Sequence, residues 1–230
     1  MKILTTVICI IASISLCHAA STTYVNGGLD RETVVMIEIT DGKVVGAYRQ
    51  HGYDGENPVE ATFTSSGTTG SIVSKHHVCD LEVYKQSFRR GFDSFYGNIE
   101  DYAVLALLPS YLEREGSSLV YMANDMISAS KHPESVFYLH DLEALKNTLL
   151  KLEAKGQKTL LMGVSYALLD LIKIHNFKLK HTIIMETGGM KGRRKEMIRN
   201  ELHEILCAGF GVSKIHSEYG MTELLSQGYS

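Results

Sequence analysis

Short apolar runs alternate with amphipathic helix patterns through most of the 230-residue chain, and this alternation most constrains its fold. Residues 103–108 (AVLALL) form a continuous apolar run that ends at Pro109, as a strand buried on both faces does. Similar runs follow at 158–164 and 182–185, and a fourth strand is predicted over 212–216. Strands that alternate with helices predict an α/β fold with a largely parallel sheet, whose ligand sites lie at the carboxyl ends of the strands.

Helical spacing of apolar residues predicts the elements that connect these strands. Apolar residues at steps of three and four predict an amphipathic helix over 76–96. Further helices are predicted over 142–152 and 165–175, and a last one ends at Gly209 or Gly211. The apolar face of that last helix is expected to consist of Ile198, Leu202, Ile205 and Leu206.

The first 61 residues are organised differently from the rest. A short basic start, an uncharged apolar run and a small-residue end at Ala19-Ala20 are typical of a cleaved secretory signal peptide over residues 1–20. A buried N-terminal strand or helix is the competing interpretation. Within residues 21–61, the Asp41-Gly42 pair between two β-branched runs predicts a β-hairpin, because Asp-Gly tolerates the positive φ of tight turns.

Composition and charge limit what the chain can bind. Hydrophobic residues make up 44% and charged residues 21% of the sequence, which suits a protein that folds around a core. The formal net charge is −3 at pH 7, so no overall positive field favours nucleic acid or an anionic membrane. The four cysteines include no Cys-x-x-Cys pair and predict neither a disulfide scaffold nor a cysteine zinc site. The N-terminal apolar run is too short to predict a stable membrane span.

Three polar, glycine-containing loops carry the candidate chemistry. Residues 65–71 (SSGTTGS) offer backbone N–H groups and hydroxyls that suit phosphate oxygens, although a solvated turn is the alternative. Residues 186–194 (ETGGMKGRR) leave a predicted strand with glycines that let a ligand approach closely. Residues 216–223 (HSEYGMTE) follow the fourth predicted strand. Their tyrosine ring suits stacking on a flat base, and their Thr-Glu pair suits phosphate together with Mg²⁺.

Taken together, the loops resemble one family. SSGTTGS at 65–71 is similar to the phosphate-binding loop of the adenylate-forming (AMP-binding) enzymes, and YGMTE at 219–223 is similar to their second core motif. Residues 107–114 and 185–192 narrow the resemblance to the acyl-protein synthetases, the LuxE-type fatty-acid–protein ligases of bacterial luminescence and their relatives. The resemblance covers residues 62–230. It implies an adenylate-forming-enzyme-like mixed sheet flanked by helices and incomplete at the C-terminus.

The resemblance also implies a reaction and a set of site residues. ATP and a fatty acid would give an acyl-adenylate, whose acyl group then passes to a thiol of an acyl-accepting or reductase protein. Catalytic roles are implied for Thr68, Thr222 and Glu223, with Glu223 also meeting Mg²⁺. The residues implied to bind ATP, around its phosphates or its adenine, are Ser65, Ser66, Gly67, Thr69, Gly70, Gly188, Gly189 and Tyr219.

Several features depart from the family pattern. Ile72 and Val73 stand where the family's loop continues with proline, and the nearest lysine is Lys75. The family's ribose-binding Asp and C-terminal part do not follow, so we expect the isolated chain to be weak or inactive in ATP–pyrophosphate exchange. The signal peptide indicates export, whereas a synthetase belongs in the cytoplasm. A synthetase fragment fused near residue 61 to the start of an exported protein is the interpretation that reconciles the two.

Two other classes of function are open from the sequence. Residues 163–167 (GVSYA) differ by one residue from the nucleophile elbow of α/β hydrolases, with Ser165 as the nucleophile. Against that reading, we expect apolar neighbours to shield Ser165 and its side chain to cap the following helix. The other class is a non-catalytic exported protein that keeps the fold. Cys207 is expected on a buried helix face, where thiols are unreactive.

Overall fold

The computed structural model describes most of the chain between Ser21 and Ser230, with the backbone alone for 21–51. The described residues are 21–26, 33–40, 43–51, 59–64, 75–108, 116–138, 141–188, 197–221 and 225–230. The predicted signal peptide and the whole of the 65–71 loop lie outside them. The assignment of these two segments therefore stays a prediction.

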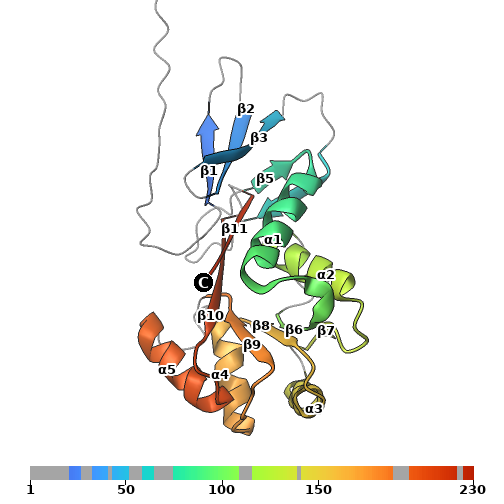
Figure 1. Cartoon of the computed structure of the whole chain (residues 1–230), viewed down its shortest axis with the longest axis vertical. Coiled ribbons are helices and arrows are strands. Elements are labelled where there is room, and N and C mark those ends of the chain that lie inside the picture. The colour runs from blue at the N-terminus through green and yellow to red at the C-terminus, as the bar shows by residue number, and fades with distance from the viewer. Residues whose placement is uncertain are drawn as a thin grey trace, which may run out of the picture.

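A six-stranded sheet forms the centre of the fold (Figure 1). Its strands are β6 Ala103–Leu107, β7 Val136–Phe137, β8 Thr159–Gly163, β9 Thr182–Glu186, β10 His216–Met221 and β11 Ser226–Tyr229. The strand order is β11-β10-β9-β8-β6-β7, and all neighbours run parallel except β11, which is antiparallel to β10. The predicted α/β fold with a largely parallel sheet is therefore confirmed, and the carboxyl ends of β8, β9 and β10 lie along one edge.

Helices cover both faces of this sheet. The described residues form α1 Leu81–Tyr96, α2 Ser118–Ser130, α3 Leu142–Ala154, α4 Ser165–Ile174 and α5 Arg199–Phe210. Helices α1 and α2 lie on one side of the sheet, and α3, α4 and α5 lie on the other (Figure 1). The first three begin after Asp80, Ser117 and Asp141, whose side-chain oxygens accept backbone N–H groups of the first turn. Helix α5 ends at Gly211, whose φ of 67° favours glycine.

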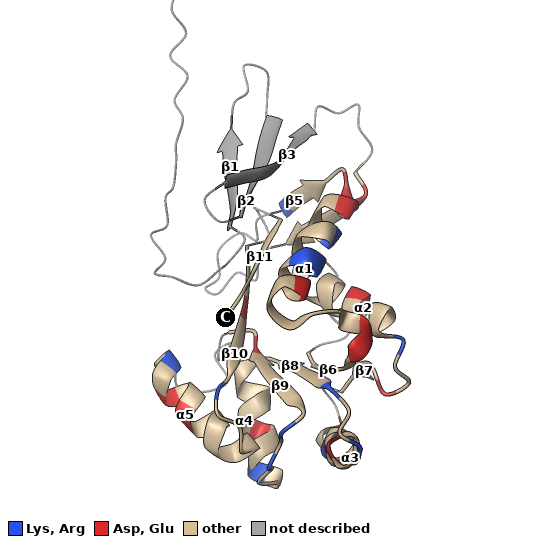
Figure 2. Ribbon diagram, viewed as in Figure 1, with Lys and Arg blue, Asp and Glu red and all other residues tan. Residues whose placement is uncertain are grey.

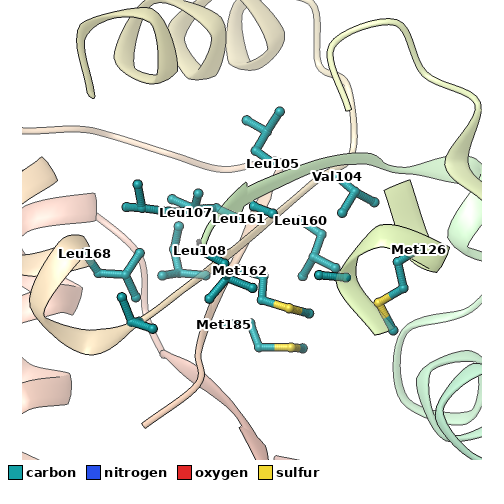
Figure 3. Close-up of a cluster of buried hydrophobic side chains, with 14 of the residues drawn as sticks. Val104, Leu105, Leu107, Leu108, Met126, Leu160, Leu161, Met162, Leu168 and Met185 are labelled. Atoms are coloured by element: carbon teal, nitrogen blue, oxygen red, sulfur yellow. The ribbon is translucent and has the colours of Figure 1, made fainter. Parts of the chain in front are cut away.

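The core lies between the parallel strands and these helices. Every residue of β6 and β8 is buried, which explains why both strands read as unbroken apolar runs in the sequence. Figure 3 shows Leu161, Met162 and Met185 of neighbouring strands gathered in this core, with Leu168 of α4 in the same cluster. Burying one such side chain contributes about 1.5–3 kcal/mol to folding.

The antiparallel strand β11 packs against α1, far away in sequence. The Tyr229 hydroxyl donates to the Phe88 carbonyl at 3.1 Å, across 141 positions of sequence. The Tyr229 ring also packs edge-on against Phe92, with ring centroids 6.0 Å apart. A Cβ added at Gly91 would lie 3.0 Å from the Tyr229 ring, so glycine permits this close approach in the middle of a helix. The β10–β11 hairpin therefore belongs to the same core as α1.

Two smaller antiparallel sheets precede the main one in sequence. Strands β1 Ser21–Asn26, β2 Thr33–Thr40 and β3 Lys43–His51 form a three-stranded sheet in that order. The predicted hairpin is confirmed, because Thr40 pairs with Lys43 across a two-residue connection. Strand β1 extends that hairpin beyond the prediction. A second pair consists of β4 Ala61–Thr64 and β5 Lys75–Val78.

Two predicted boundaries are wrong. The helix predicted over 76–96 begins only at Leu81, because Asp80 caps it and Val78 belongs to β5. The fourth strand, predicted over 212–216, begins at His216, since Gly211 closes α5 and a short connection follows. The HSEY segment therefore forms part of a strand and is not a loop that follows one.

The predicted apolar face of α5 is correct only in part. Leu202 and Leu206 are buried as predicted. Ile198 and Ile205 are instead 72% and 37% exposed. Phe210, which ends the helix and packs against Phe177, completes the buried face.

Charged residues of both signs are distributed along the helices (Figure 2). The best-formed surface pair joins α1 to α2, where Arg89 donates two hydrogen bonds of 2.8 Å to Asp125. Such exposed pairs contribute little to stability. Within the described residues, no helix is both long enough and apolar enough to cross a membrane.

Candidate functional site

Gly188 and Tyr219 are the two predicted site residues that the structure describes. The others lie outside the described residues, and their roles stay predictions: Ser65, Ser66, Gly67, Thr68, Thr69, Gly70, Gly189, Thr222 and Glu223. The candidate site is therefore built from Gly188, Tyr219 and the side chains that surround them at the carboxyl edge of the sheet.

Gly188 and Tyr219 lie at the same distance in sequence from the last residue pair between β9 and β10. Glu186 pairs with Ser217 where the pairing ends, and each predicted residue lies two positions further along its strand direction. Tyr219 is 66% exposed, so its ring is accessible for stacking. Gly188 has a φ of 79°, and an added Cβ would meet no described atom within 4 Å. An exposed aromatic ring on β10 and an open glycine just after β9 thus lie beyond the last residue pair of these two neighbouring strands.

The buried carboxylate of Glu186 accepts hydrogen bonds from three neighbouring segments. It lies at the end of β9 and is 3% exposed. Its Oε1 accepts from the Ser217 hydroxyl of β10 at 2.7 Å, and its Oε2 accepts from the Gly188 backbone N–H at 2.7 Å. The Ser165 hydroxyl of α4 also donates to Oε2, at 3.2 Å. Hydrogen bonds to an ionised acceptor are stronger than neutral ones, so this carboxylate ties α4, β9 and β10 together.

Two side chains of α5 also face Glu186. Arg199 Nη2 lies 3.4 Å from Oε1, and His203 Nε2 lies 3.6 Å from the same oxygen. That buried histidine nitrogen has no hydrogen-bond partner among the described residues. Burial by itself would raise the pKa of Glu186. The hydrogen bonds from Ser217 and Gly188 and the charge of Arg199 outweigh it, so the pKa lies below its usual value. Glu186 is therefore ionised at neutral pH.

Glu218 is a second buried carboxyl group, on the adjacent strand. It is 7% exposed and follows Ser217 on β10, so the two side chains point to opposite faces of the sheet. The Gln227 amide of β11 donates a hydrogen bond to Glu218. Burial raises the pKa of Glu218 to about 7, and the negative charge of Glu186 adds to the rise, against the effect of Gln227. Glu218 therefore changes its charge near neutral pH.

His216 and Tyr96 form a second buried polar pair between β10 and α1. The Tyr96 hydroxyl lies 3.0 Å from Nδ1 of His216. Burial, together with the charge of Lys214, lowers the pKa of His216 to about 4. Burial also raises the pKa of Tyr96 to about 12. Both side chains are therefore neutral at pH 7.

A buried tyrosine connects the strands that flank two of the predicted loops. The Tyr84 ring of α1 packs against Phe63 of β4, with centroids 5.6 Å apart. The Tyr84 hydroxyl donates to the Gln227 side-chain oxygen of β11 at 3.4 Å. Strand β4 precedes residues 65–74, and β11 follows residues 222–224. The strands beside the two loops therefore meet at one residue, while the expected closeness of the loops themselves stays a prediction.

Ser165 is buried as expected, but it does not cap α4. Ser165 is 2% exposed and is the first helical residue. The N-cap position belongs to Val164, which makes no side-chain capping bond. The capping prediction is wrong because the Glu186 carboxylate takes up the Ser165 hydroxyl. A buried hydroxyl that bonds a carboxylate does not match an exposed nucleophile next to a histidine.

Thiol and metal chemistry find little support in the described residues. Cys207 is partly buried and unpaired with Cys79, and burial raises the pKa of its thiol, as expected for an unreactive cysteine. No group of three or more His, Cys, Asp or Glu side chains suited to a metal ion occurs in the described parts of the chain. The predicted Mg²⁺ ligand, Glu223, lies outside them.

The sequence analysis did not assign roles to Glu186, Ser217 and Glu218. A signal for Glu186 exists, since it is the polar residue that ends the apolar strand TIIME, where parallel sheets place their sites. Ser217 and Glu218 carry no such signal, because the HSEY segment reads as an ordinary polar loop. They are buried because they lie in strand β10, which the sequence pattern predicted too early, over 212–216.

Comparison with known proteins gives one structural similarity. No protein-family model matches the chain, and no curated protein matches its sequence. Among solved structures, the crystal structure of ATP-bound MatB from Rhodopseudomonas palustris is similar to it with a TM-score of 0.49 and 21% sequence identity. The aligned part covers 72% of this chain and 29% of MatB, so this chain spans under a third of that protein's length.

Proposed function

We propose that residues 62–230 form the nucleotide-binding part of an adenylate-forming ligase, which activates a fatty acid with ATP and passes the acyl group to a protein thiol. The positions of Gly188 and Tyr219, each two residues beyond the last β9–β10 residue pair, carry the proposal. The two residues belong to different sequence motifs, and both follow the last residue pair of the neighbouring strands β9 and β10 in sequence. The carboxyl ends of the strands are where parallel α/β sheets bind nucleotides.

The open glycine and the exposed ring suit a purine base. A ring that is 66% exposed can stack on a flat base, and a glycine without close neighbours lets the base approach the backbone. Hydroxyls and N–H groups of the Ser65–Gly70 loop would then hold the phosphates. Glu223 would meet Mg²⁺, which offsets the phosphate charge.

The proposed reaction has two steps. A carboxylate oxygen of the fatty acid attacks the α-phosphorus of ATP, the bond to pyrophosphate breaks, and an acyl-adenylate forms. A thiolate of the acceptor protein then attacks the acyl carbon, and AMP leaves. The chain's contribution is mainly to position the reactants and to stabilise negative charge. Cys207 does not suit the acceptor role, because burial raises its pKa.

Titration of the full chain with ATP in the presence of Mg²⁺, by calorimetry, tests this proposal. We expect the wild type to bind ATP and Tyr219→Ala to weaken binding about tenfold, since stacking contributes about 1–3 kcal/mol per base. Tyr219→Phe keeps the ring and should bind as the wild type does. A wild type that does not bind ATP contradicts the proposal, and equal affinity in Tyr219→Ala contradicts the stacking role.

Exchange of pyrophosphate into ATP in the presence of a fatty acid tests the chemistry separately. Any exchange that the wild type shows should disappear in Thr68→Ala and in Glu223→Ala. Exchange that survives both substitutions would remove these residues from the proposed site.

A further inference from the structure

We propose that Glu186 is a positioning residue that holds Gly188 and the β10 strand of Tyr219 in a fixed relation, so that a purine base can enter beside them. The inference rests on the proposed function for the identity of the ligand. It assigns Glu186 a role that the motif resemblance does not supply.

The two oxygens of Glu186 serve the two sides of this site. Oε2 accepts from the Gly188 N–H at 2.7 Å, and this bond supports the left-handed turn at Gly188. Oε1 accepts from Ser217 at 2.7 Å, two residues before Tyr219. A carboxylate is rigid and planar, so its two oxygens lie at a fixed distance from each other. The glycine turn and the strand that carries Tyr219 are each hydrogen-bonded to one of these oxygens, which fixes their relative position.

The surroundings of Glu186 favour a positioning role over a catalytic one. Its carboxylate is 3% exposed and its hydrogen-bonding capacity is directed at protein donors. Arg199, whose side chain is 60% exposed, lies on the outer side and supplies positive charge. Glu186 therefore acts on a ligand only through Gly188 and β10.

Glu186→Gln is the direct test, made in the full chain. The carboxamide keeps the size of the side chain but removes its negative charge. If its oxygen stays on the Gly188 N–H, its NH₂ group faces Ser217 and the Arg199 guanidinium, and the bond from Gly188 is no longer charge-assisted. Glu204→Gln, at an exposed position of α5, is the matched control. If the Gln variant does not fold, Ser217→Ala removes the β10 bond alone and tests the same link.

Hydrogen exchange at the Gly188 amide, measured by NMR without any ligand, tests the hydrogen-bonded link by itself. We expect exchange to become about tenfold faster in Glu186→Gln, because the acceptor of the Gly188 N–H loses its charge. The Thr187 amide, which donates to the Gly163 carbonyl at 3.0 Å, should change much less. Unchanged Gly188 exchange overturns the inference.

Affinities for ATP, AMP and inorganic tripolyphosphate test the link to the ligand. We expect Glu186→Gln to weaken ATP and AMP by the same factor, about tenfold, and to leave tripolyphosphate unchanged. Ser217→Ala should weaken ATP and AMP by a smaller factor. Faster Gly188 exchange with unchanged ATP affinity overturns the positioning role. A wild type that binds tripolyphosphate but neither nucleotide overturns the proposed function instead. Hydrogen exchange at the Gly188 amide then still tests whether Glu186 holds the glycine turn.

Discussion

Two neighbouring regions of the sheet each bury one carboxyl group and treat it in opposite ways. At the end of β9, Glu186 is 3% exposed and has a pKa below its usual value. On β10, within the β10–β11 hairpin, Glu218 is 7% exposed and its pKa is raised to about 7. Glu186 accepts from two hydroxyls and a backbone N–H beside an arginine, whereas Glu218 accepts from one amide. The larger supply of donors keeps Glu186 charged against the effect of burial, whereas burial dominates at Glu218.

Replacing Glu186 by leucine should change the free energy of unfolding more than the other substitutions at these two carboxyl groups. Glu186→Leu leaves the donors of Ser165, Ser217 and Gly188 buried without an acceptor. We expect a loss of about 4 kcal/mol in the free energy of unfolding at pH 7, measured by urea denaturation. The exposed control Glu204→Leu should change it by less than about 0.5 kcal/mol. A loss below about 1 kcal/mol for Glu186→Leu would show that its hydrogen bonds do not stabilise the fold.

Glu218→Gln should act in the opposite direction, and only above acidic pH. The folded-state pKa of Glu218 is raised, so the folded protein holds this proton more tightly and loses stability as pH rises from 4.5 through about 7. The neutral glutamine avoids that cost. We expect Glu218→Gln to stabilise the protein by about 3 kcal/mol at pH 8 and by almost nothing at pH 4. A stability difference that does not vary with pH would contradict the raised pKa.

His216 must be considered in the same pH series. Its folded-state pKa is lowered to about 4, so its contribution to stability is lost as pH falls through 6.5 toward 4. In that range it opposes the gain from Glu218, and the wild-type stability should vary little with pH. For this reason the Glu218→Gln measurement compares variant and wild type at each pH, and does not rely on the shape of either curve.

Ser165→Ala should have the smallest effect. It removes one of the donors to Glu186, at 3.2 Å, and we expect a loss of about 1 kcal/mol in the free energy of unfolding. A fluorophosphonate probe should not label the wild-type chain at Ser165, because the hydroxyl is buried against a carboxylate. Covalent capture at Ser165 would favour the hydrolase alternative. Glu186 would then belong to a reactive site, and its contrast with Glu218 could no longer be explained by hydrogen-bond donors alone.

The sequence predicted the centre of the fold better than its edges. Strands β6, β8 and β9 are buried parallel strands, so their apolar runs identify them directly. The leucines of helix α3 recur at helical spacing, so the sequence predicted this helix equally well. Strand β11, with the sequence SQGY, packs through one tyrosine and carries no periodic signal.

Only part of the candidate site was predictable from the sequence. Gly188 and Tyr219 stand in motifs that are visible in the sequence, and each lies two residues beyond the last β9–β10 residue pair. The burial of Glu186 and Glu218 depends on donors from α4, β10 and β11, which are distant in sequence. No local pattern reports such a partner, so a charged residue reads as exposed until the fold brings its donors to it.

The contact between β11 and α1 has a consequence for synthesis of the chain. Tyr229 reaches Phe88 across 141 positions of sequence, so α1 is made well before the strand that covers its aromatic side. At about 5–20 residues per second, the delay on the ribosome is on the order of ten seconds. During that time Phe88 and Phe92, fully buried in the finished protein, lack the Tyr229 part of their packing. Nascent chains of this protein therefore expose an aromatic surface that invites chaperone binding until β11 has emerged.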